Sequence, residues 1–265
     1  MLRKNGDVYF MFRKILLVIS VVSFSFALTP FEIAQKVKEN SDGYGSSKST
    51  LEMVLIDQTK NESKRVMHSL SFENRDKNGK DGDKSLMEFK MPLDVKGTKF
   101  LTHEKIDKNN NQWLYLPALK RIKRITSKNK SGSFMGSEFS YEDIASREPS
   151  KYDYSKEYKE VELKGVKSYK YERYPKDQNS GYSKQIVWVD ASRFVGLKIE
   201  FYDRKKELLK TATYSNYKKI GDTYRVGSIF MQNHQNHKST KLNYLEDEIH
   251  LNLDASLFTK RYLKD

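Results

Sequence analysis

The feature that most constrains the fold of this chain is an alternation of apolar and polar residues that begins after Gly45. Leu51, Met53 and Leu55 recur at every second position, and the same period of two occurs in segments 65–72 and 86–91. Successive side chains of a strand point to opposite faces of a sheet. The pattern therefore predicts antiparallel strands with two unlike faces.

The second half of the chain continues this alternation. It occurs in six further segments: 158–174, 183–190, 195–203, 208–217, 223–233 and 238–251. Clusters of turn-forming residues interrupt the pattern, at 74–83, 174–177, 202–205 and 219–222. About ten short strands at regular spacing predict one sandwich or barrel. The expected fold class is mainly β (α+β), with a few helices packed on one face of a large antiparallel sheet.

A helix is expected at residues 30–40, before the first strand. Thr29 can cap it, Pro30 suits its first position, and Glu32 completes a capping box. Its apolar face is expected to carry Phe31, Ala34 and Val37, with Ile33 on the flank.

Two short helical segments are expected later in the chain. Ser140 to Asp143 forms a possible capping box, which explains Glu142 and Asp143 without a catalytic role. A second short helix is expected from Asp254. Its expected docking residues are Leu257, Phe258 and Leu263.

The N-terminal 27 residues have the pattern of a cleavable signal peptide. Arg13 and Lys14 precede an uncharged apolar stretch, 15–26, and Ser25 and Ala27 provide the small residues of a cleavage site. An uncleaved membrane anchor is the alternative. However, the uncharged run 15–31 is 17 residues long and contains Ser, Thr and Pro, whereas a spanning helix needs about 20 predominantly apolar residues.

Cleavage after Ala27 would leave residues 28–265 as a single exported domain. Residues 1–10 are interpreted as an upstream extension, with Met11 as the true start. No cysteine follows the cleavage site, so the mature chain is not expected to be a lipoprotein itself.

The chain is strongly basic, with 49 Lys plus Arg against 35 Asp plus Glu and a formal net charge of +14. Such a balance favours nucleic-acid binding in general, but an exported protein meets membrane lipid and acidic protein surfaces instead. The residues expected to dock headgroups or a partner protein are Lys120, Arg121, Lys123 and Arg124. The alternative for this cluster is a solvated basic strand end.

Residues that carry common chemistries are missing. The chain has no cysteine, which excludes disulfides, thiolate metal sites and cysteine nucleophiles. His234 and His237 are three positions apart and would point to opposite faces of a strand, so a polar loop explains them better than a metal site. No Gly-x-Ser-x-Gly or His-Glu-x-x-His motif occurs. Neither enzymatic activity nor a cofactor is expected.

Segment 92–145 contains the most distinctive sequence. It includes Val95-Lys96-Gly97-Thr98, then Trp113-Leu114-Tyr115-Leu116-Pro117 with its basic continuation, and then Gly132-Ser133-Phe134-Met135-Gly136-Ser137-Glu138-Phe139-Ser140-Tyr141-Glu142-Asp143. In these stretches the sequence resembles the outer-membrane lipoprotein-sorting protein family, relatives of the LolA/LolB periplasmic lipoprotein carriers. The resemblance covers essentially all of residues 28–265.

The resemblance implies an incomplete antiparallel β-barrel around a hydrophobic cavity, with helices as a lid. It also implies a periplasmic location, acyl chains of lipoproteins or other lipids as cargo, and an inner-membrane lipid transporter and an outer-membrane acceptor as possible partners. The helix at 30–40 and the segment 134–144 are the candidate lids.

Seven residues are expected to form the lipid-binding cavity or its lid. They are Trp113, Tyr115, Phe134, Met135, Phe139, Phe89 and Leu101. Trp113 and Tyr115 share one face of their strand, Leu114 and Leu116 share the other, and the sequence leaves open which face is the inner one. The alternative is an ordinary sandwich core.

The function expected from these observations is a carrier that moves acylated cargo toward the outer membrane without chemistry. Exposing acyl chains to water costs about 0.8 kcal/mol per methylene, so crossing an aqueous compartment requires a large apolar surface. An adaptor that docks on a membrane lipid transporter without cargo of its own is the first alternative. A periplasmic enzyme or sensor for a small hydrophobic molecule is the second.

Overall fold

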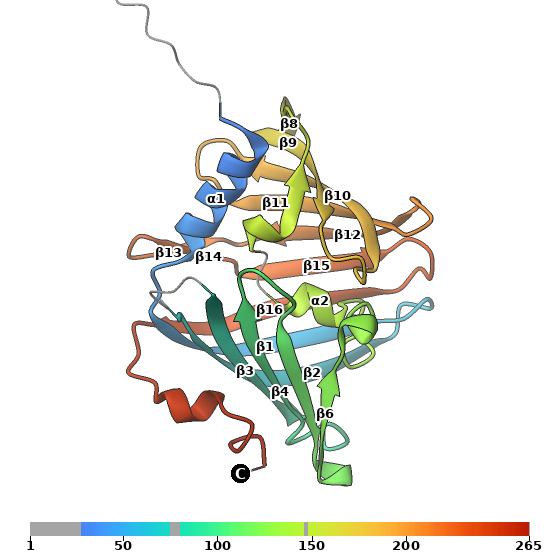
Figure 1. Cartoon of the computed structure of the whole chain (residues 1–265). Helices are drawn as coiled ribbons and strands as arrows, with labels where there is room; N and C mark the ends of the chain where they lie inside the picture. The colour runs from blue at the N-terminus through green and yellow to red at the C-terminus, as the bar shows by residue number, and fades with distance from the viewer. Residues whose placement is uncertain (1–27, 75–79, 146–147, 265) are drawn as a thin grey trace, which may run out of the picture.

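The computed structural model describes residues 28–74, 80–145 and 148–264 (Figure 1). The predicted signal peptide, residues 1–27, lies outside this range. Most of the described chain forms one curved sheet of fourteen antiparallel strands, and a two-stranded ribbon lies beside it.

The sixteen strands of the described residues follow one another along the chain. They are β1 (Ser46–Ile56), β2 (Glu62–Phe72), β3 (Asp81–Met91), β4 (Lys99–Lys105), β5 (Asn111–Leu116), β6 (Arg121–Ile125), β7 (Tyr152–Tyr154), β8 (Lys159–Leu163), β9 (Val166–Pro175), β10 (Tyr182–Asp190), β11 (Gly196–Asp203), β12 (Leu208–Ser215), β13 (Lys218–Ile220), β14 (Thr223–Arg225), β15 (Ser228–Asn233) and β16 (Ser239–Ile249). The helices are α1 (Pro30–Ser41) and α2 (Tyr141–Ile144), with the 3-10 turns η1 (Pro117–Leu119), η2 (Ser127–Asn129), η3 (Pro149–Lys151) and η4 (Ala255–Phe258).

The two halves of the sheet join at its centre, where β1 pairs with β16. The strand order is β6-β5-β4-β3-β2-β1-β16-β15-β12-β11-β10-β9-β7, and β8 also pairs with β9. The register of the central pair runs from Ser47 opposite Ile249 to Ile56 opposite Ser239. Strands β6 and β7 end the sheet without pairing to each other. The expected incomplete antiparallel barrel is therefore confirmed as a curved sheet that does not close.

The expected number of about ten strands was too low. Segment 158–174 contains both β8 and β9, because Lys164 and Gly165, with φ of 50° and 82°, form a tight turn. Segment 223–233 divides into β14 and β15. Strands β4, β7 and β13 lie where no strand was predicted. Strands β7 and β13 have three residues each, which is too short for a periodic signal. Strand β4 has seven residues, but its first four are all buried and do not alternate.

Helix α1 begins as predicted. Thr29 N–H donates to Glu32 Oε2 at 2.7 Å, and Glu32 N–H donates to Thr29 Oγ1 at 3.2 Å, which completes the capping box. Ala34 is buried as expected, but so is Ile33, which was expected on the flank. Phe31 is 39% exposed instead of buried and packs edge-on against Tyr154.

Apolar side chains occupy both faces of the sheet. The inner face, which α1 and the segment around α2 cover, carries the main core, including the fully buried Leu51, Met53 and Met67. The outer face carries a smaller cluster, in which Leu86 and Leu101 pack against the C-terminal segment 251–264. In that segment Phe258 and Leu263 are buried, as predicted, although the expected helix is only the 3-10 turn η4.

Candidate functional site

Residues 130–145, here called the insert, connect the β6 end of the sheet to the β7 end and lie across the inner face (Figure 1). The insert folds back on itself: Ser133 and Ser140 form a bridge, and Phe134 N–H donates to Phe139 O at 2.7 Å. Met135 and Gly136 make the reversal with φ of 52° and 74°. This left-handed conformation suits glycine far better than methionine.

The tip of the insert places two aromatic rings in the main core. Phe134 is 0% exposed and Phe139 is 2% exposed. The ring centre of Phe134 lies 5.0 Å from that of Phe100 and 6.0 Å from that of Phe89. The inner face is therefore filled by side chains of a segment that is not itself part of the sheet.

Polar contacts attach the insert to strands on both sides of the sheet centre. The Arg65 guanidinium of β2 donates to Met135 O. The Glu138 carboxylate accepts from Asn233 Nδ2 at 2.7 Å and from Asn236 Nδ2 at 3.1 Å. Glu138 N–H also donates to Thr240 Oγ1 at 3.0 Å. These non-covalent contacts fix the position of the insert against the sheet.

A buried ion pair attaches the base of the insert. Lys210 Nζ lies 2.6 Å from Asp143 Oδ2, and the two side chains are 5% and 2% exposed. Tyr182 donates its hydroxyl proton to Asp143 Oδ1 at 2.8 Å, and Ser140 N–H donates to Oδ2 at 2.7 Å. Burial opposes ionisation of Asp143, but the Lys210 ammonium and the Ser140 hydrogen bonds outweigh it and lower the pKa of this carboxyl.

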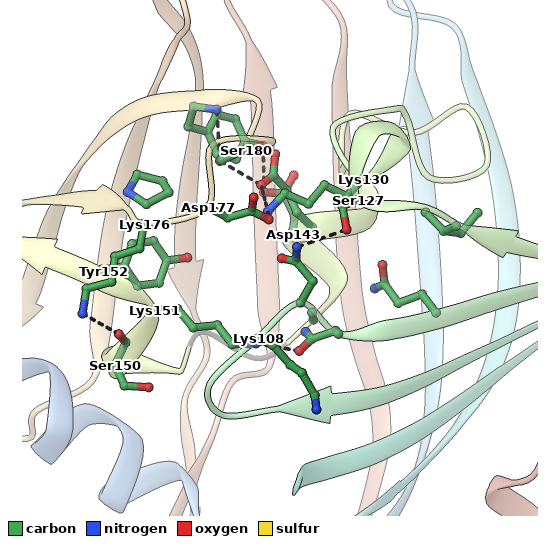
Figure 2. A pocket seen from close by; sticks show the side chains of 18 of the residues that line it. Lys108, Ser127, Lys130, Asp143, Ser150, Lys151, Tyr152, Lys176, Asp177 and Ser180 are labelled. Atoms are coloured by element: carbon green, nitrogen blue, oxygen red, sulfur yellow. Dashed lines mark hydrogen bonds and ion pairs between the residues drawn. The ribbon is translucent and has the colours of Figure 1, made fainter. Parts of the chain in front are cut away.

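A pocket of about 570 Å³ opens beside the insert, between the β4–β5 turn and the β9–β10 turn (Figure 2). Its volume lies within the roughly 300–1,000 Å³ of small-molecule sites. Its mouth is polar, with Lys130 Nζ 2.6 Å from Asp177 Oδ2. Ile125 and Phe201, which line it more deeply, belong to the main core. The pocket thus leads from charged groups to the apolar inner face.

Glu142 forms part of the same wall. Its carboxylate accepts from Gly181 N–H at 2.8 Å and from Ser180 Oγ at 2.9 Å. Burial raises the pKa of Glu142 despite these bonds and the Lys130 ammonium at 3.6 Å. Glu142 therefore joins the insert to the β9–β10 turn.

The seven residues expected at the cavity or lid fall on two faces. Phe89, Phe134, Met135 and Phe139 pack together in the main core of the inner face. Leu101, Trp113 and Tyr115 lie in the outer cluster against the C-terminal segment, so the expectation that they join the inner residues was wrong. None of the seven lines the pocket. Both faces of strand β5 carry apolar residues. The distant segments that cover each face, and not the sequence of β5 itself, determine which face is the inner one.

The four expected docking residues lie together at one end of the sheet. Lys120, Arg121, Lys123 and Arg124 are exposed on and before β6. Because β6 is an edge strand, its cations also discourage pairing with other chains. Tertiary structure adds further cations here, since Lys260, Arg261 and Lys264 line a shallow hollow with Arg124 over Trp113 and Ile122.

The two histidines singled out in the sequence lie in the turn between β15 and β16. His234 Nε2 is 2.8 Å from Thr211 Oγ1, and His237 has a φ of 58°. Within residues 28–74, 80–145 and 148–264, no group of three or more His, Asp or Glu side chains could hold a metal ion. In the same ranges, no helix combines the length and apolar character that a membrane crossing requires.

The buried ion pair and the side chains that contact the pocket wall include residues that the sequence did not predict. Lys210 occupies an inward position of β12, in register with the buried Ala212 and Tyr214. Arg173 occupies an inward position of β9 in the same way, two residues after the buried Tyr171. The sequence signal that could have identified both residues is a charged side chain on the strand face that otherwise carries apolar residues.

Three solved structures resemble this chain over most of its length. A candidate outer membrane lipoprotein-sorting protein domain from Vibrio parahaemolyticus is 45% identical, covers 89% of this chain and 98% of its own, and superposes with a TM-score of 0.83. A DUF1329 family protein from Desulfovibrio piger is 28% identical, with 88% and 97% covered and a TM-score of 0.81. A LolA superfamily protein from Nitrosomonas europaea is 22% identical, with 89% and 100% covered and a TM-score of 0.70, and shows the fold alone.

Two further comparisons are less specific. A family model described as "Uncharacterized protein" matches residues 81–265. The search of curated proteins gave no significant match.

Proposed function

The chain belongs to the family of outer membrane lipoprotein-sorting proteins, and on this premise we propose that it is a periplasmic carrier of lipoproteins or other lipids. It binds acyl chains on the inner face of its open sheet and moves them toward the outer membrane without chemistry. The predicted signal peptide, residues 1–27, provides export to the periplasm.

The observation that carries the proposal is the position of the insert. An open sheet presents a large apolar inner face, and the rings of Phe134 and Phe139 occupy it from a segment held by side-chain contacts. In this proposal the insert is the lid, and its withdrawal exposes apolar surface for cargo. Each buried methylene of that cargo contributes about 0.8 kcal/mol.

The composition of the inner face supports variable cargo. Met53, Met67 and Met231 are each 0% exposed there. Methionine side chains are flexible and polarisable, so they repack around partners of different shape. Helix α1 is a second candidate lid, since Ile33 and Ala34 pack into the same core.

The primary test is mass spectrometry of an organic extract from the protein, purified without detergent from its own periplasm. A stoichiometric acylated species would support the carrier function and identify the cargo. A folded protein without lipid would overturn it.

A matched pair of variants tests the lid. Glu138→Ala removes the carboxylate that accepts from Asn233 and Asn236, whereas Glu62→Ala makes the same change at an exposed position of β2. The insert competes with acyl chains for the inner face, so a larger open fraction raises apparent affinity. Glu138→Ala should therefore carry more lipid than wild type, and Glu62→Ala should not. Equal lipid content in all three proteins would reject the lid.

The adaptor remains the second candidate, and one observation favours it. The inner face is filled by the chain's own side chains, including Phe89, Phe100 and Phe134. An adaptor would use exposed residues such as Lys120 and Arg121 to dock on a membrane lipid transporter. It would yield no lipid in the extract and would be recovered with the transporter after crosslinking.

A further inference from the structure

The pocket beside the insert is associated with two buried or half-buried cations that no carboxylate of the described residues contacts. The first is Lys151, whose side chain extends into the pocket (Figure 2). Among the described residues, its ammonium donates one hydrogen bond, to the Asn110 amide oxygen at 2.6 Å. Burial lowers the pKa of Lys151, although Glu104 and Glu148 partly oppose the effect. An ammonium has three donors, so two remain for a ligand.

The second cation is Arg173, which is 4% exposed. Its Nε donates to Gln185 Oε1 at 2.8 Å, and its guanidinium carbon lies 4.2 Å from the ring centre of Tyr152. Gln185 and Tyr152 both line the pocket, whereas Arg173 does not line it itself and contacts its wall through these two residues. Its Nη2 is buried and has no hydrogen-bond partner among the described residues.

The deeper carboxylates of the pocket wall already have cationic partners. Asp143 pairs with Lys210 at 2.6 Å, and Asp177 pairs with Lys130 at the same distance. Glu142 is 3.6 Å from Lys130 and accepts two further hydrogen bonds. A buried cation without a counter-charge is costly. Glu104 and Glu148 offset part of that cost for Lys151, and an anion entering the pocket would reduce the remaining cost for Lys151 and Arg173.

We propose that this pocket binds the anionic headgroup of an amphiphilic lipid, a phosphate or a carboxylate, between Lys151 and Arg173. This inference rests on the carrier function proposed above and specifies the class of its cargo. Ammonium and guanidinium groups form charge-assisted hydrogen bonds with both anions. Ile125 and Phe201 connect the pocket to the inner face, so the acyl chain of such a lipid would continue into the main core.

The test compares three probes on the chain without its first 27 residues: dodecyl phosphate, dodecyl maltoside below its micelle concentration, and inorganic phosphate. Isothermal titration calorimetry should give an affinity for dodecyl phosphate about tenfold or more above that for dodecyl maltoside, as expected for charge-assisted bonds. Inorganic phosphate alone should bind much more weakly, because it buries no apolar surface.

Three variants assign the preference to residues. Lys151→Gln and Arg173→Gln should each weaken dodecyl phosphate binding about tenfold and leave dodecyl maltoside binding unchanged. Lys64→Gln is the matched control, because Lys64 is a cation on β2 that does not line the pocket and whose side chain is 61% exposed. Its effect should stay within about twofold, as for other exposed charges. A folding defect in Arg173→Gln would obscure its effect on binding. Arg173→Lys is therefore measured beside it, because it keeps the charge at the buried position.

The outcomes separate the two proposals. Equal affinity for both amphiphiles, in wild type and variants, would overturn the anionic headgroup and leave the carrier function standing. Binding of neither amphiphile by a folded protein would overturn the carrier function. Inorganic phosphate binding as tightly as dodecyl phosphate would make the pocket a free-anion site and overturn the lipid assignment.

Discussion

At the scale of single residues, the most consequential contact is the ion pair between Asp143 and Lys210. It joins the base of the insert to β12, which lies beyond the centre of the sheet. Both side chains are almost fully buried, and Tyr182 and Ser140 complete the hydrogen bonds of the carboxylate. Removing one member of such a pair leaves the other charge buried without a partner.

Asp143→Asn should therefore lower the free energy of unfolding by about 3–5 kcal/mol. Urea denaturation measures this change. Asp222→Asn is the control, since Asp222 pairs with Lys219 at 3.9 Å on the surface and should contribute less than about 1 kcal/mol. Equal effects of the two substitutions would mean that the buried pair does not stabilise the fold.

The Asp143 carboxylate should also make the free energy of unfolding depend on pH. The pKa of Asp143 is lowered in the folded protein, so its contribution is fully present above the unfolded pKa of about 3.9 and is lost as pH falls through the lower folded value. The difference in unfolding free energy between wild type and Asp143→Asn should stay constant from about pH 7 to pH 5 and narrow only below about pH 4. A difference that narrows near pH 6 would contradict the lowered pKa.

At the scale of elements, the C-terminal segment decides which side of the first-half strands is the outer face. Phe258 packs against Phe72 with ring centres 5.8 Å apart, and its carbonyl oxygen lies 2.7 Å from His103 Nε2. Leu101 and Leu263 complete the cluster at 0% exposed. Without this segment, apolar side chains of β3, β4 and β5 would face water.

Phe258→Ala should cost about 3–5 kcal/mol of unfolding free energy, because it leaves a cavity beneath the segment. Leu257→Ala, at the neighbouring half-buried position, should cost less. Limited proteolysis should cut Phe258→Ala near the C-terminus before it cuts wild type. Identical cleavage patterns would show that Phe258 does not hold the segment in place.

At the scale of the whole molecule, the sheet depends on pairing between the two ends of the described chain. Strand β1 lies between β2 and β16, and β16 also pairs with β15, so within the sheet β16 joins the halves 46–125 and 152–233. Such long-range pairing makes folding slow, because loop closure precedes the contacts that offset its entropy.

A chain ending before Ser239 should fail to fold, since β1 and β15 would both lose their common partner β16 and present unpaired edges. Circular dichroism and size-exclusion chromatography would report unfolded or aggregated protein. A monomeric, cooperatively unfolding product would show that the two halves fold independently.

The sequence by itself determined the antiparallel strands, the capping box of α1 and the family resemblance. These depend on local spacing: a period of two fixes alternate faces, and Thr29 lies three residues from Glu32. Phe134 and Phe139 are buried with Phe89 in the main core, and their role in binding lipid stays a prediction.

Only the tertiary structure decided which face of each strand is the inner one and where the pocket lies. Trp113 and Tyr115 alternate with Leu114 as any strand residues do, but the C-terminal segment covers one face and the insert the other. The pocket combines residues from Ile106 to Phe201. A local pattern specifies that a strand has two faces, whereas distant segments determine what each face contacts.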